Sequence, residues 1–321
     1  MQPQPDQGPA TSTVFITGAT GFIGQNLVKG LLASGHRVRV LIRPGLHSEE
    51  RVPGGCEQVS ANLLDTEKLA EIIAATDAVI YCAGSVRGRD AADFARANVD
   101  GVEAMTQALE KSGHRPPLLL ISSLAASRPQ LSHYADSKFK GEQVLSAHAD
   151  LPWTILRPPA VYGPGDKEML PLLQWARRGY AVHPGPREQH LSLLYVTDLV
   201  RAIEAWLAKP QNGVHRIFSI DDGTPGGYDW PAIAESVSER PARLVRLPRI
   251  VLNLVAVANL CLSYVFRYAP MLTPGKVREL CQPEWLCDNS EFMAATGWRP
   301  KLNLTEGARR LFAVEGNTEP H

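Results

Sequence analysis

The chain has 321 residues, enough for a full hydrophobic core in one large domain or two smaller ones. It carries 33 basic and 33 acidic side chains, so no net field draws it toward nucleic acid or an anionic membrane, and we expect no nucleic-acid partner. The five cysteines are scattered without a C-x-x-C pair, which argues against a disulfide framework or a metal site and favours a reducing, cytoplasmic location.

The N-terminal segment 1–12 is polar and rich in proline, without the basic and apolar regions of a signal peptide. We predict that it is a disordered tail. The first strand is expected at 13–17 (TVFIT), followed by a helix over 22–35 that ends at a glycine, and a second strand at 37–42 (RVRVLI).

Helical and strand patterns then alternate. Helices are expected at 66–76, 98–113 and 124–145, and strands at 77–84, 117–123 and 153–163. Strands alternating with helices of this length imply βαβ units and a parallel sheet covered on both faces. The predicted class is therefore α/β, a Rossmann-type doubly wound parallel sheet.

The regular alternation ends near residue 165, where proline and glycine become frequent. Segments 193–208 and 213–220 have the pattern of further α/β elements of the same sheet. We predict a dinucleotide-binding domain of 13–165, with 191–221 added to its sheet. The smaller, mostly helical substrate lobe is then 166–190 and 222–321.

Segment 250–266 contains 17 residues without a charge. A membrane-spanning helix needs about 20 apolar residues, and Asn253, Asn259 and Ser263 interrupt this one. We expect no integral membrane span, but a buried or partly amphipathic helix of the small lobe. Peripheral contact with a membrane surface, or the wall of an apolar substrate pocket, are the alternatives.

Three glycines, Gly18, Gly21 and Gly24, lie between the first strand and the first helix. Such a turn needs residues without Cβ so that the backbone can approach a pyrophosphate and the helix can pack on the strand. The helix N-terminus then offers unpaired N–H groups and the positive end of its dipole. The spacing predicts dinucleotide binding.

The end of the second strand bears on the choice of cofactor. An acid at this position binds the 2′-hydroxyl of NAD, whereas a cation accommodates the 2′-phosphate of NADP. Arg43 follows Ile42 here, Arg39 lies earlier in the strand, and the stretch has no acid. NADP(H) is therefore favoured; NAD(H) remains open if Arg43 is only a solvated residue at the strand end.

With these residues placed, the chain resembles the extended branch of the short-chain dehydrogenase/reductase superfamily. That branch includes nucleotide-sugar epimerases and dehydratases, dihydroflavonol reductases and 3β-hydroxysteroid dehydrogenases. The resemblance rests on six motifs in the family's order: TGATGFIG, ANVDG (97–101), ISSLAAS (121–127), YADSK (134–138), RPPAVYGPGD (157–166) and TGWRPKLNLTEG (296–307). They cover nearly the whole chain from residue 13.

The resemblance implies a catalytic role for four residues. Tyr134 would be the general acid/base, and Lys138 would lower its pKa and hold the nicotinamide ribose. Ser123 matches the catalytic serine, with Ser122 as the alternative, and Asn98 matches a residue that supports the active-site helix. Hydride transfer at a carbon bearing oxygen needs a matched proton transfer, and free tyrosine titrates near ~10. A lysine one turn away and a positively charged nicotinamide would favour the phenolate.

The resemblance also implies a set of cofactor contacts in addition to Tyr134, Lys138 and Arg43. Asn62 and Leu63 fall where an Asp-Leu pair usually meets the adenine, and Pro158 and Val161 where the family contacts the nicotinamide. The remaining predicted contacts are Gly18, Thr20, Gly21, Phe22, Ile23 and Gly24 in the loop, and Cys82, Ala83 and Gly84 after the third strand.

Departures from the family pattern narrow the reaction. Leu124 and Ala125 stand where dehydratases place an acidic pair, and Leu191 replaces an arginine that binds the nucleotide of sugar substrates; Arg187 or Arg216 could substitute for it. We predict hydride transfer between a nicotinamide and a ketone or secondary alcohol of a relatively apolar small molecule. A nucleotide-sugar epimerase is the alternative, and a non-catalytic cofactor-sensing protein the third. By analogy with the family, a homodimer would form through helices near 98–112 and 134–148.

Overall fold

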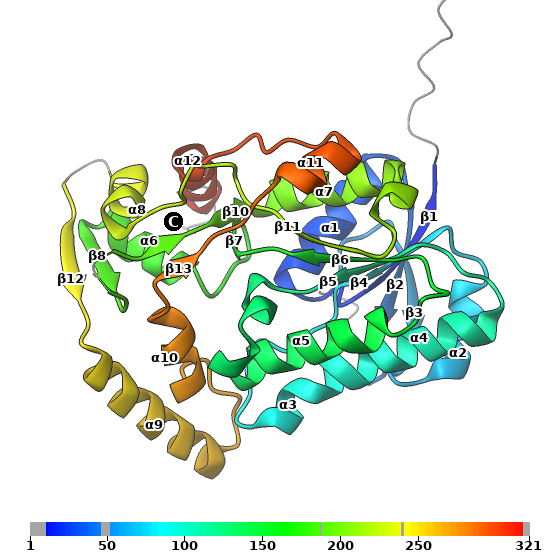
Figure 1. Cartoon of the computed structure of the whole chain (residues 1–321), viewed down its shortest axis with the longest axis horizontal. Helices are drawn as coiled ribbons and strands as arrows, with labels where there is room; N and C mark the ends of the chain where they lie inside the picture. Colours follow the sequence, from blue (N-terminus) through cyan, green and yellow to red (C-terminus); the bar gives the residue numbers. More distant parts are fainter. Residues whose placement is uncertain (1–10, 46–51, 187, 239–240, 317–321) are drawn as a thin grey trace, which may run out of the picture.

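The computed structural model describes residues 11–45, 52–186, 188–238 and 241–316 (Figure 1). Most of the predicted tail, 1–12, therefore lies outside the described residues. The main feature is a seven-stranded sheet with the order β11-β6-β5-β4-β1-β2-β3 and parallel pairing throughout. Its strands are β1 (Thr13–Thr17), β2 (Arg37–Ile42), β3 (Glu57–Ser60), β4 (Ala78–Tyr81), β5 (Leu118–Ile121), β6 (Trp153–Arg157) and β11 (Arg216–Ser219).

Helices cover both faces of this sheet, and each face has its own core. Because side chains alternate along a strand, Val14 and Ile16 pack into one core while Phe15 packs into the other. The first core is closed by α1 (Phe22–Ala33) and α7 (Val196–Ala208). The second is closed by α2 (Thr66–Ile73), α4 (Gly101–Ser112) and α5 (His133–Ser146). The predicted Rossmann-type class is confirmed.

Two strands differ from the sequence prediction. Segment 153–163 is not one strand but two, β6 and β7 (Ala160–Tyr162), and β7 leaves the large sheet to pair with β10 (Leu193–Tyr195). Pro158 and Pro159 separate them, and because proline has no N–H the ladder of the large sheet cannot continue. The edge strand β3 was not predicted, since its sequence EQVS is largely exposed and has no apolar alternation.

Asp198 would be expected from its sequence position to cap helix α7, and that expectation is wrong. The N-cap position belongs to Tyr195, and Asp198 lies in the first turn, fully buried. Its carboxylate accepts the N–H groups of Lys301 and Leu302 at 3.1 and 2.8 Å and pairs with Arg201. Asp198 therefore fixes the C-terminal segment against the large sheet.

The smaller lobe is built around a separate apolar cluster that includes Tyr162, Tyr195 and Trp230. Helices α6 (Leu170–Arg177), α8 (Trp230–Val237) and α12 (Leu304–Gly316) enclose it. Two short parallel pairs join β8 (Tyr180–His183) to β12 (Arg243–Arg246) and β9 (His190–Leu191) to β13 (Glu284–Trp285). Helix α11 (Ser290–Thr296) returns to the large sheet, where Phe292 packs against Phe218. The exact domain boundaries stay a prediction.

The apolar segment forms helix α9 (Arg249–Phe266), which lies beside α10 (Pro274–Leu280) at the edge of the small lobe (Figure 1). Only 17% of it is buried. Of the two expected forms, the fully buried helix is wrong and the partly amphipathic helix agrees with the structure, because α9 packs along a narrow line of Leu252 and Ala256 against Val277. Among the described residues, α9 is long and apolar enough to cross a membrane by length and composition.

Candidate active site

The glycine loop packs tightly against the end of β4. Gly18 has φ +75°, and a Cβ on it would lie 2.7 Å from the backbone of Cys82 and Ala83. A Cβ on Gly24 would lie 2.1 Å from the carbonyl oxygen of Gly18. Both positions therefore require glycine, and together they draw α1 close to the ends of β1 and β4.

The N-terminus of α1 has the features of an anion site. Gly21 is its N-cap and provides no side-chain cap, and the first turn contains no acidic residue. The N–H groups of such a turn point along the helix axis toward the loop, where the dipole favours a negative group. Gly21, exposed at this end, leaves room for close approach of a phosphate. Thr20, Phe22 and Ile23 flank it, so the loop fits the pyrophosphate of a dinucleotide.

The segment after β4 joins the predicted cofactor loop to the predicted catalytic residues. The N–H of Ala83 donates to Thr17 Oγ1 at 3.1 Å, which fixes the ends of β4 and β1 together. A Cβ on Gly84 would lie 3.0 Å from Asn98 Oδ1 and 3.1 Å from Lys138 Nζ. Burial raises the pKa of Cys82 to about 11, so this residue is a thiol at neutral pH.

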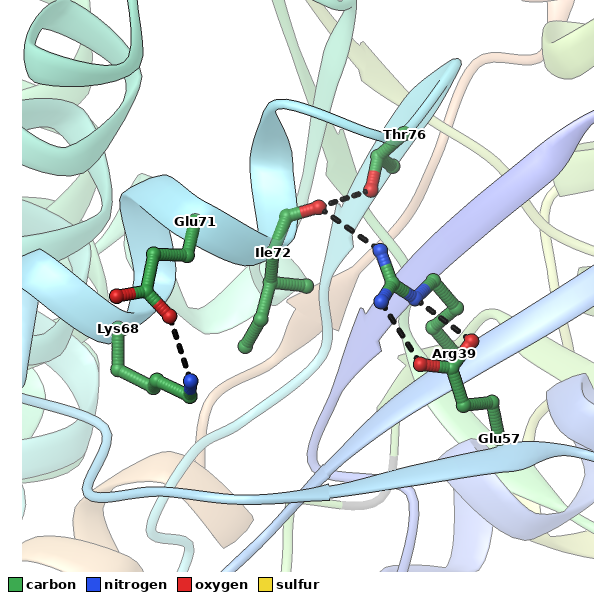
Figure 2. A network of polar contacts seen from close by, with 6 residues as sticks. All are labelled: Arg39, Glu57, Lys68, Glu71, Ile72 and Thr76. Atoms are coloured by element: carbon green, nitrogen blue, oxygen red, sulfur yellow. Dashed lines mark hydrogen bonds and ion pairs between the residues drawn. The ribbon is translucent and has the colours of Figure 1, made fainter.

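The two arginines of β2 lie in different places. Arg43 follows the strand and is exposed at the edge where the glycine loop lies. Arg39 instead makes two hydrogen bonds to Glu57 of β3, at 2.7 and 2.9 Å, and one to the carbonyl of Ile72, as Figure 2 shows. Arg39 therefore holds β2, β3 and α2 together. Any selection for a 2′-phosphate rests on Arg43.

Asn62 and Leu63 form the turn between β3 and α2. Asn62 is exposed, and its Oδ1 accepts the N–H of Leu64 at 3.1 Å. Leu63 packs against α4, where a Cβ on Gly101 would lie 2.7 Å from its Cδ2. The turn follows the carboxyl end of β3, at the same edge of the sheet as the glycine loop. Leu63 could pack on the flat face of an adenine, and the exposed amide of Asn62 could hydrogen-bond its polar edge.

Ser123 lies close enough to Tyr134 for its side chain to lower the pKa of the phenol. Ser123 follows β5 and caps a 3₁₀ turn, Leu124–Ser127, by accepting the N–H of Ala125 at 3.2 Å. Tyr134 lies in the first turn of α5, whose N-cap Ser132 accepts the N–H of Ala135 at 3.0 Å. Burial raises the pKa of Tyr134, and Ser123 lowers it by less.

The neighbouring serine has a different role in the fold. The Ser122 hydroxyl is buried and donates to Glu142 of α5, which also forms a buried ion pair with Arg157, with 2.9 Å between Nε and Oε1. Arg157 belongs to β6, so these three residues fasten α5 to the ends of two strands. Pro158, the next residue, accepts the N–H of Leu124 at 2.8 Å. Val161, on β7, packs against the first core.

Lys138 and Asn98 both lie next to Gly84. The Lys138 ammonium is buried and donates to the carbonyl of Ile121 at 3.0 Å, and burial lowers its pKa to about 8. Asn98 belongs to a π-helical turn, Arg96–Asp100, and its amide donates to Ser85 O and Ser137 Oγ at 3.0 and 2.9 Å. Turns of this type occur frequently at functional sites.

The same π-helical turn sets the distance between α4 and α5. A Cβ on Gly141, in the middle of α5, would lie 2.0 Å from the carbonyl oxygen of Asn98. Only glycine fits at this crossing. The position of α5, and with it Tyr134 and Lys138, therefore depends on backbone contact with the turn that carries Asn98.

Two charged residues at this site were not predicted from the sequence. Lys276 of α10 lies 5.9 Å from the centre of the Tyr134 ring and donates to Glu279 at 2.9 Å. Buried Glu279 also accepts the hydroxyl of Ser132. Lys276 lowers the pKa of Tyr134 and Glu279 raises it. Lys276 is therefore a further cation near the phenol, in addition to Lys138, whose role at Tyr134 stays a prediction.

Nothing in the sequence signals this pair, because α10 is short and lies far along the chain from YADSK. Tyr134 and Lys276 meet at a cleft of about 230 Å³. Its apolar wall comes from three separate segments: the loop after β4, α3 (Ala91–Ala95), and the residues around α9. Wall residues include Val86, Phe94, Leu260, Pro270 and Met271. The ring centres of Phe94 and Tyr134 are 6.2 Å apart.

Comparison with known proteins places these features in context. The model of the NAD dependent epimerase/dehydratase family matches residues 14–221. A ceramide reductase of Caulobacter vibrioides is 33% identical over 302 residues, covering 93% of this chain and 92% of that protein. A 2-alkyl-3-oxoalkanoate reductase of Stenotrophomonas maltophilia is 26% identical, covering 94% of this chain and 98% of that protein.

Solved structures share the fold at lower identity. The epimerase Mth375 of Methanothermobacter thermautotrophicus superposes with a TM-score of 0.73 at 17% identity, covering 96% of this chain and 93% of that one. A UDP-glucose 4-epimerase of Thermotoga maritima superposes with a TM-score of 0.72 at 21% identity, covering 95% of this chain and 99% of that one. At such identities the likeness concerns the fold alone.

Proposed function

The chain belongs to the NAD-dependent epimerase/dehydratase family, and from this premise we propose that it reduces a ketone on a long-chain, apolar substrate with NAD(P)H. It is an NAD(P)-dependent oxidoreductase of the extended short-chain dehydrogenase/reductase type. The observation that carries the proposal is the proximity of Ser123 to Tyr134, at a cleft where Phe94, Leu260 and Met271 form an apolar part of the wall.

In the proposed reaction the glycine loop and Lys138 would hold a nicotinamide cofactor, which would supply the hydride for the carbonyl carbon. Tyr134 donates its proton to the carbonyl oxygen, which becomes the hydroxyl of a secondary alcohol. The Ser123 hydroxyl hydrogen-bonds this oxygen while negative charge develops on it. Lys138, within reach of Gly84, is suited to hold the nicotinamide ribose.

The charge state of Tyr134 is compatible with the proposed reduction. Burial raises its pKa above the ordinary value, so the phenol stays protonated at neutral pH and is ready to act as an acid. Oxidation of an alcohol would need the phenolate instead. Lys276 lowers the pKa of Tyr134 and so favours the phenolate, whereas Glu279 raises this pKa and favours the phenol.

The proposed substrate class follows from the wall of the cleft. Phe94, Leu260 and Met271 present apolar surface in the same cleft as Tyr134. By the family resemblance, Leu191 stands where an arginine would bind a nucleotide. Two relatives that cover most of this chain are named as a ceramide reductase and a 2-alkyl-3-oxoalkanoate reductase. We therefore propose a ketone close to a polar group, at the end of an alkyl or acyl chain.

The alternative is a nucleotide-sugar epimerase, favoured by the fold of the solved neighbours. It needs a cation for the nucleotide phosphates. Arg187 lies outside the described residues. Arg216 begins β11, at the opposite end of the strands from the glycine loop, and pairs there with Glu291 at 2.7 Å. Arg216 is therefore not placed to serve such a substrate.

Three finer features complete the proposal. Arg43 would select NADP(H) over NAD(H). A homodimer would form through α4 and α5, and the enzyme would act in the cytoplasm or on its membrane surface.

The test is NADPH oxidation by the purified enzyme with a panel of ketones. We expect turnover with a 2-alkyl-3-oxoalkanoate or a ceramide-type ketone of long chain, and at least about tenfold lower kcat/KM when the chain is shortened to a few carbons. Tyr134→Phe should bind NADPH as wild type does and lose about 10²–10⁴ in kcat. UDP-sugars should neither turn over nor raise the melting temperature.

Turnover that survives in Tyr134→Phe would remove this residue from the chemistry. Thermal protection by UDP-glucose together with its epimerisation would replace the reductase proposal with the alternative.

A further inference from the structure

Helix α9 exposes apolar side chains that a folded chain usually covers. Ile250 is 75% exposed, Leu254 67%, Val265 73% and Phe266 71%. Val251, Val255, Val257 and Leu262 are also exposed, so the apolar surface runs along the whole helix. Contiguous apolar surface of this kind marks an interaction site.

The segment around α9 is also strongly basic, although the whole chain is neutral. From Pro241 to Arg278 the sequence contains no aspartate or glutamate. The cations of that stretch are Arg243, Arg246, Arg249, Arg267, Lys276 and Arg278. Of these, Arg243 and Arg246 are exposed on β12, and Arg249 and Arg267 are exposed at the two ends of α9. An apolar helix face bordered by arginines is the pattern of a helix that lies in the interface of an anionic membrane.

The anchoring of α9 to the fold decides between lying on a membrane and crossing it. Its 18 residues reach ~27 Å, slightly less than the ~30 Å hydrocarbon core. Leu252 and Ala256 pack on α10, Asn259 donates to the carbonyl of Leu272 at 2.9 Å, and Arg89 lies over the Tyr264 ring at 5.6 Å. Crossing the bilayer would break these contacts, whereas lying flat keeps them and covers the exposed face.

The active-site cleft is continuous with this helix. Leu260 of α9, together with Pro270 and Met271 just beyond it, lines the same cleft as Tyr134. Tyr264 and Tyr268 are exposed in and just after this helix, and aromatic rings with a polar tip favour the headgroup level of a bilayer. One helix therefore contributes both an exposed apolar face and part of the wall of the cleft.

We propose that α9 docks the enzyme on the surface of an anionic phospholipid bilayer, with its exposed face among the headgroups and upper acyl chains. The cleft then opens against the bilayer, and a lipid ketone reaches Tyr134 without passing through water. Docking itself is independent of the activity; only this access route rests on the proposed function.

The test uses flotation of the full chain with vesicles of phosphatidylglycerol and phosphatidylcholine, or of phosphatidylcholine alone. We expect wild type to float with the anionic vesicles and to float much less with the neutral ones. It should be released by 0.5 M salt, because the Debye length then falls from ~8 Å at physiological ionic strength to ~3–5 Å. The double variant Leu254→Asp/Val265→Asp should lose at least about tenfold in bound fraction, because two carboxylates would enter an apolar, anionic layer.

The matched control is Val314→Asp, an exposed apolar residue of α12, which Figure 1 places on the other side of the small lobe from α9. This variant should float like wild type. With a short-chain ketone that dissolves in water, both variants should turn over as wild type does. With a long-chain ketone embedded in vesicles, the α9 variant should lose at least about tenfold in rate.

Failure of wild type to float, or equal flotation with neutral vesicles, would overturn the docking proposal, while turnover of a detergent-dispersed ketone would show that the proposed function stands. A wild-type dimer that the α9 double variant converts to a monomer would also overturn it, since the face would then join two copies of the chain. Loss of all turnover with every ketone would instead refute the proposed function, whatever the flotation result.

Discussion

The ammonium of Lys276 lies 5.9 Å from the centre of the Tyr134 ring, although the two residues come from different lobes. Lys276 and its partner Glu279 influence the phenol in opposite senses, the first lowering and the second raising its pKa. The small lobe thus influences the pKa of Tyr134, whereas Ser123, Tyr134 and Lys138 themselves belong to the domain of the large sheet.

This relationship predicts opposite pH shifts for two variants. Alcohol oxidation needs the phenolate, whose fraction rises as the pH passes the pKa of Tyr134. Lys276→Met removes the group that lowers this pKa, so the rise of kcat with pH should move to higher pH. Glu279→Gln removes a group that raises it, so the rise should move to lower pH. Shifts in the same direction in the two pH profiles would show that their effect is only structural.

Substitutions of the two neighbouring serines, Ser122 and Ser123, should have different effects on kcat and on stability. Ser123→Ala removes the hydroxyl that lowers the pKa of the Tyr134 phenol, and we expect a loss of about 10² in kcat with unchanged stability. Ser122→Ala removes a donor to buried Glu142 and should instead cost about 1 kcal/mol in the free energy of unfolding, with kcat close to wild type. Urea titration and steady-state kinetics on both variants test this. The reverse pattern would make Ser122 the catalytic serine.

Cofactor choice should depend on Arg43. Arg43→Glu is expected to weaken NADPH binding at least about tenfold, or 1.4 kcal/mol, and to leave NADH binding equal or tighter. Arg39→Gln is the matched control, because Arg39 bonds Glu57 and Ile72 and should leave the ratio of the two affinities unchanged. Fluorescence titration measures both. Tighter binding of NADH than NADPH by wild type would contradict the NADP assignment.

Two glycines of the loop should behave differently. Gly24→Ala places a methyl group against the carbonyl of Gly18 and should cost about 2 kcal/mol in stability, with loss of cofactor binding. Gly21→Ala meets its nearest neighbour at 3.4 Å, so it should fold normally while its methyl group obstructs the pyrophosphate and weakens NADPH binding about tenfold. Thermal melts with and without NADPH distinguish the two effects. Normal NADPH binding by Gly21→Ala would argue against a phosphate at this turn.

Burial of Lys138 should be visible in the pH dependence of stability. Its pKa falls from 10.5 to about 8 on folding, so between these values the unfolded chain binds more protons and stability rises with pH. Lys138→Met lacks this cost, and its stability relative to wild type should be greatest near pH 7 and decrease by about 1 kcal/mol or more toward pH 10. Lys29→Met, an exposed change on α1, should follow wild type. If the free energies of unfolding of Lys138→Met and wild type changed with pH in parallel, burial of the charged Lys138 would not cost stability.

Local patterns were sufficient to predict most of the large sheet. The segments TVFIT and RVRVLI show apolar alternation in the sequence itself. The glycine loop could be predicted because the contacts that require Gly18 and Gly24 are made within a few residues or with one neighbouring strand. The edge strand β3 escaped because its residues are mostly exposed. Segment 153–163 forms two strands instead of one because Pro158 and Pro159 interrupt the backbone hydrogen bonding of the large sheet. The prolines were visible in the sequence, but the apolar residues on both sides favoured the prediction of a single strand.

The site was only partly predictable for a similar reason. Tyr134, Lys138 and Ser123 occur close together in the sequence, but Lys276, Glu279 and Phe94 meet Tyr134 only through tertiary packing. The sequence left open whether helix α9 is buried or partly amphipathic, because an uncharged run has the same composition whether a protein core or another surface covers it. Composition alone does not identify what the apolar face contacts.

The crossing of Gly141 with the carbonyl of Asn98 limits how this enzyme can be altered. Substitution there would move the tyrosine and the lysine together, so a mutant library that includes this position would contain mostly inactive members. The walls of the cleft offer more freedom, because Val86, Leu260 and Met271 come from segments outside that crossing. An effort to broaden the range of ketones accepted should therefore randomise these wall residues and keep the helix crossing fixed.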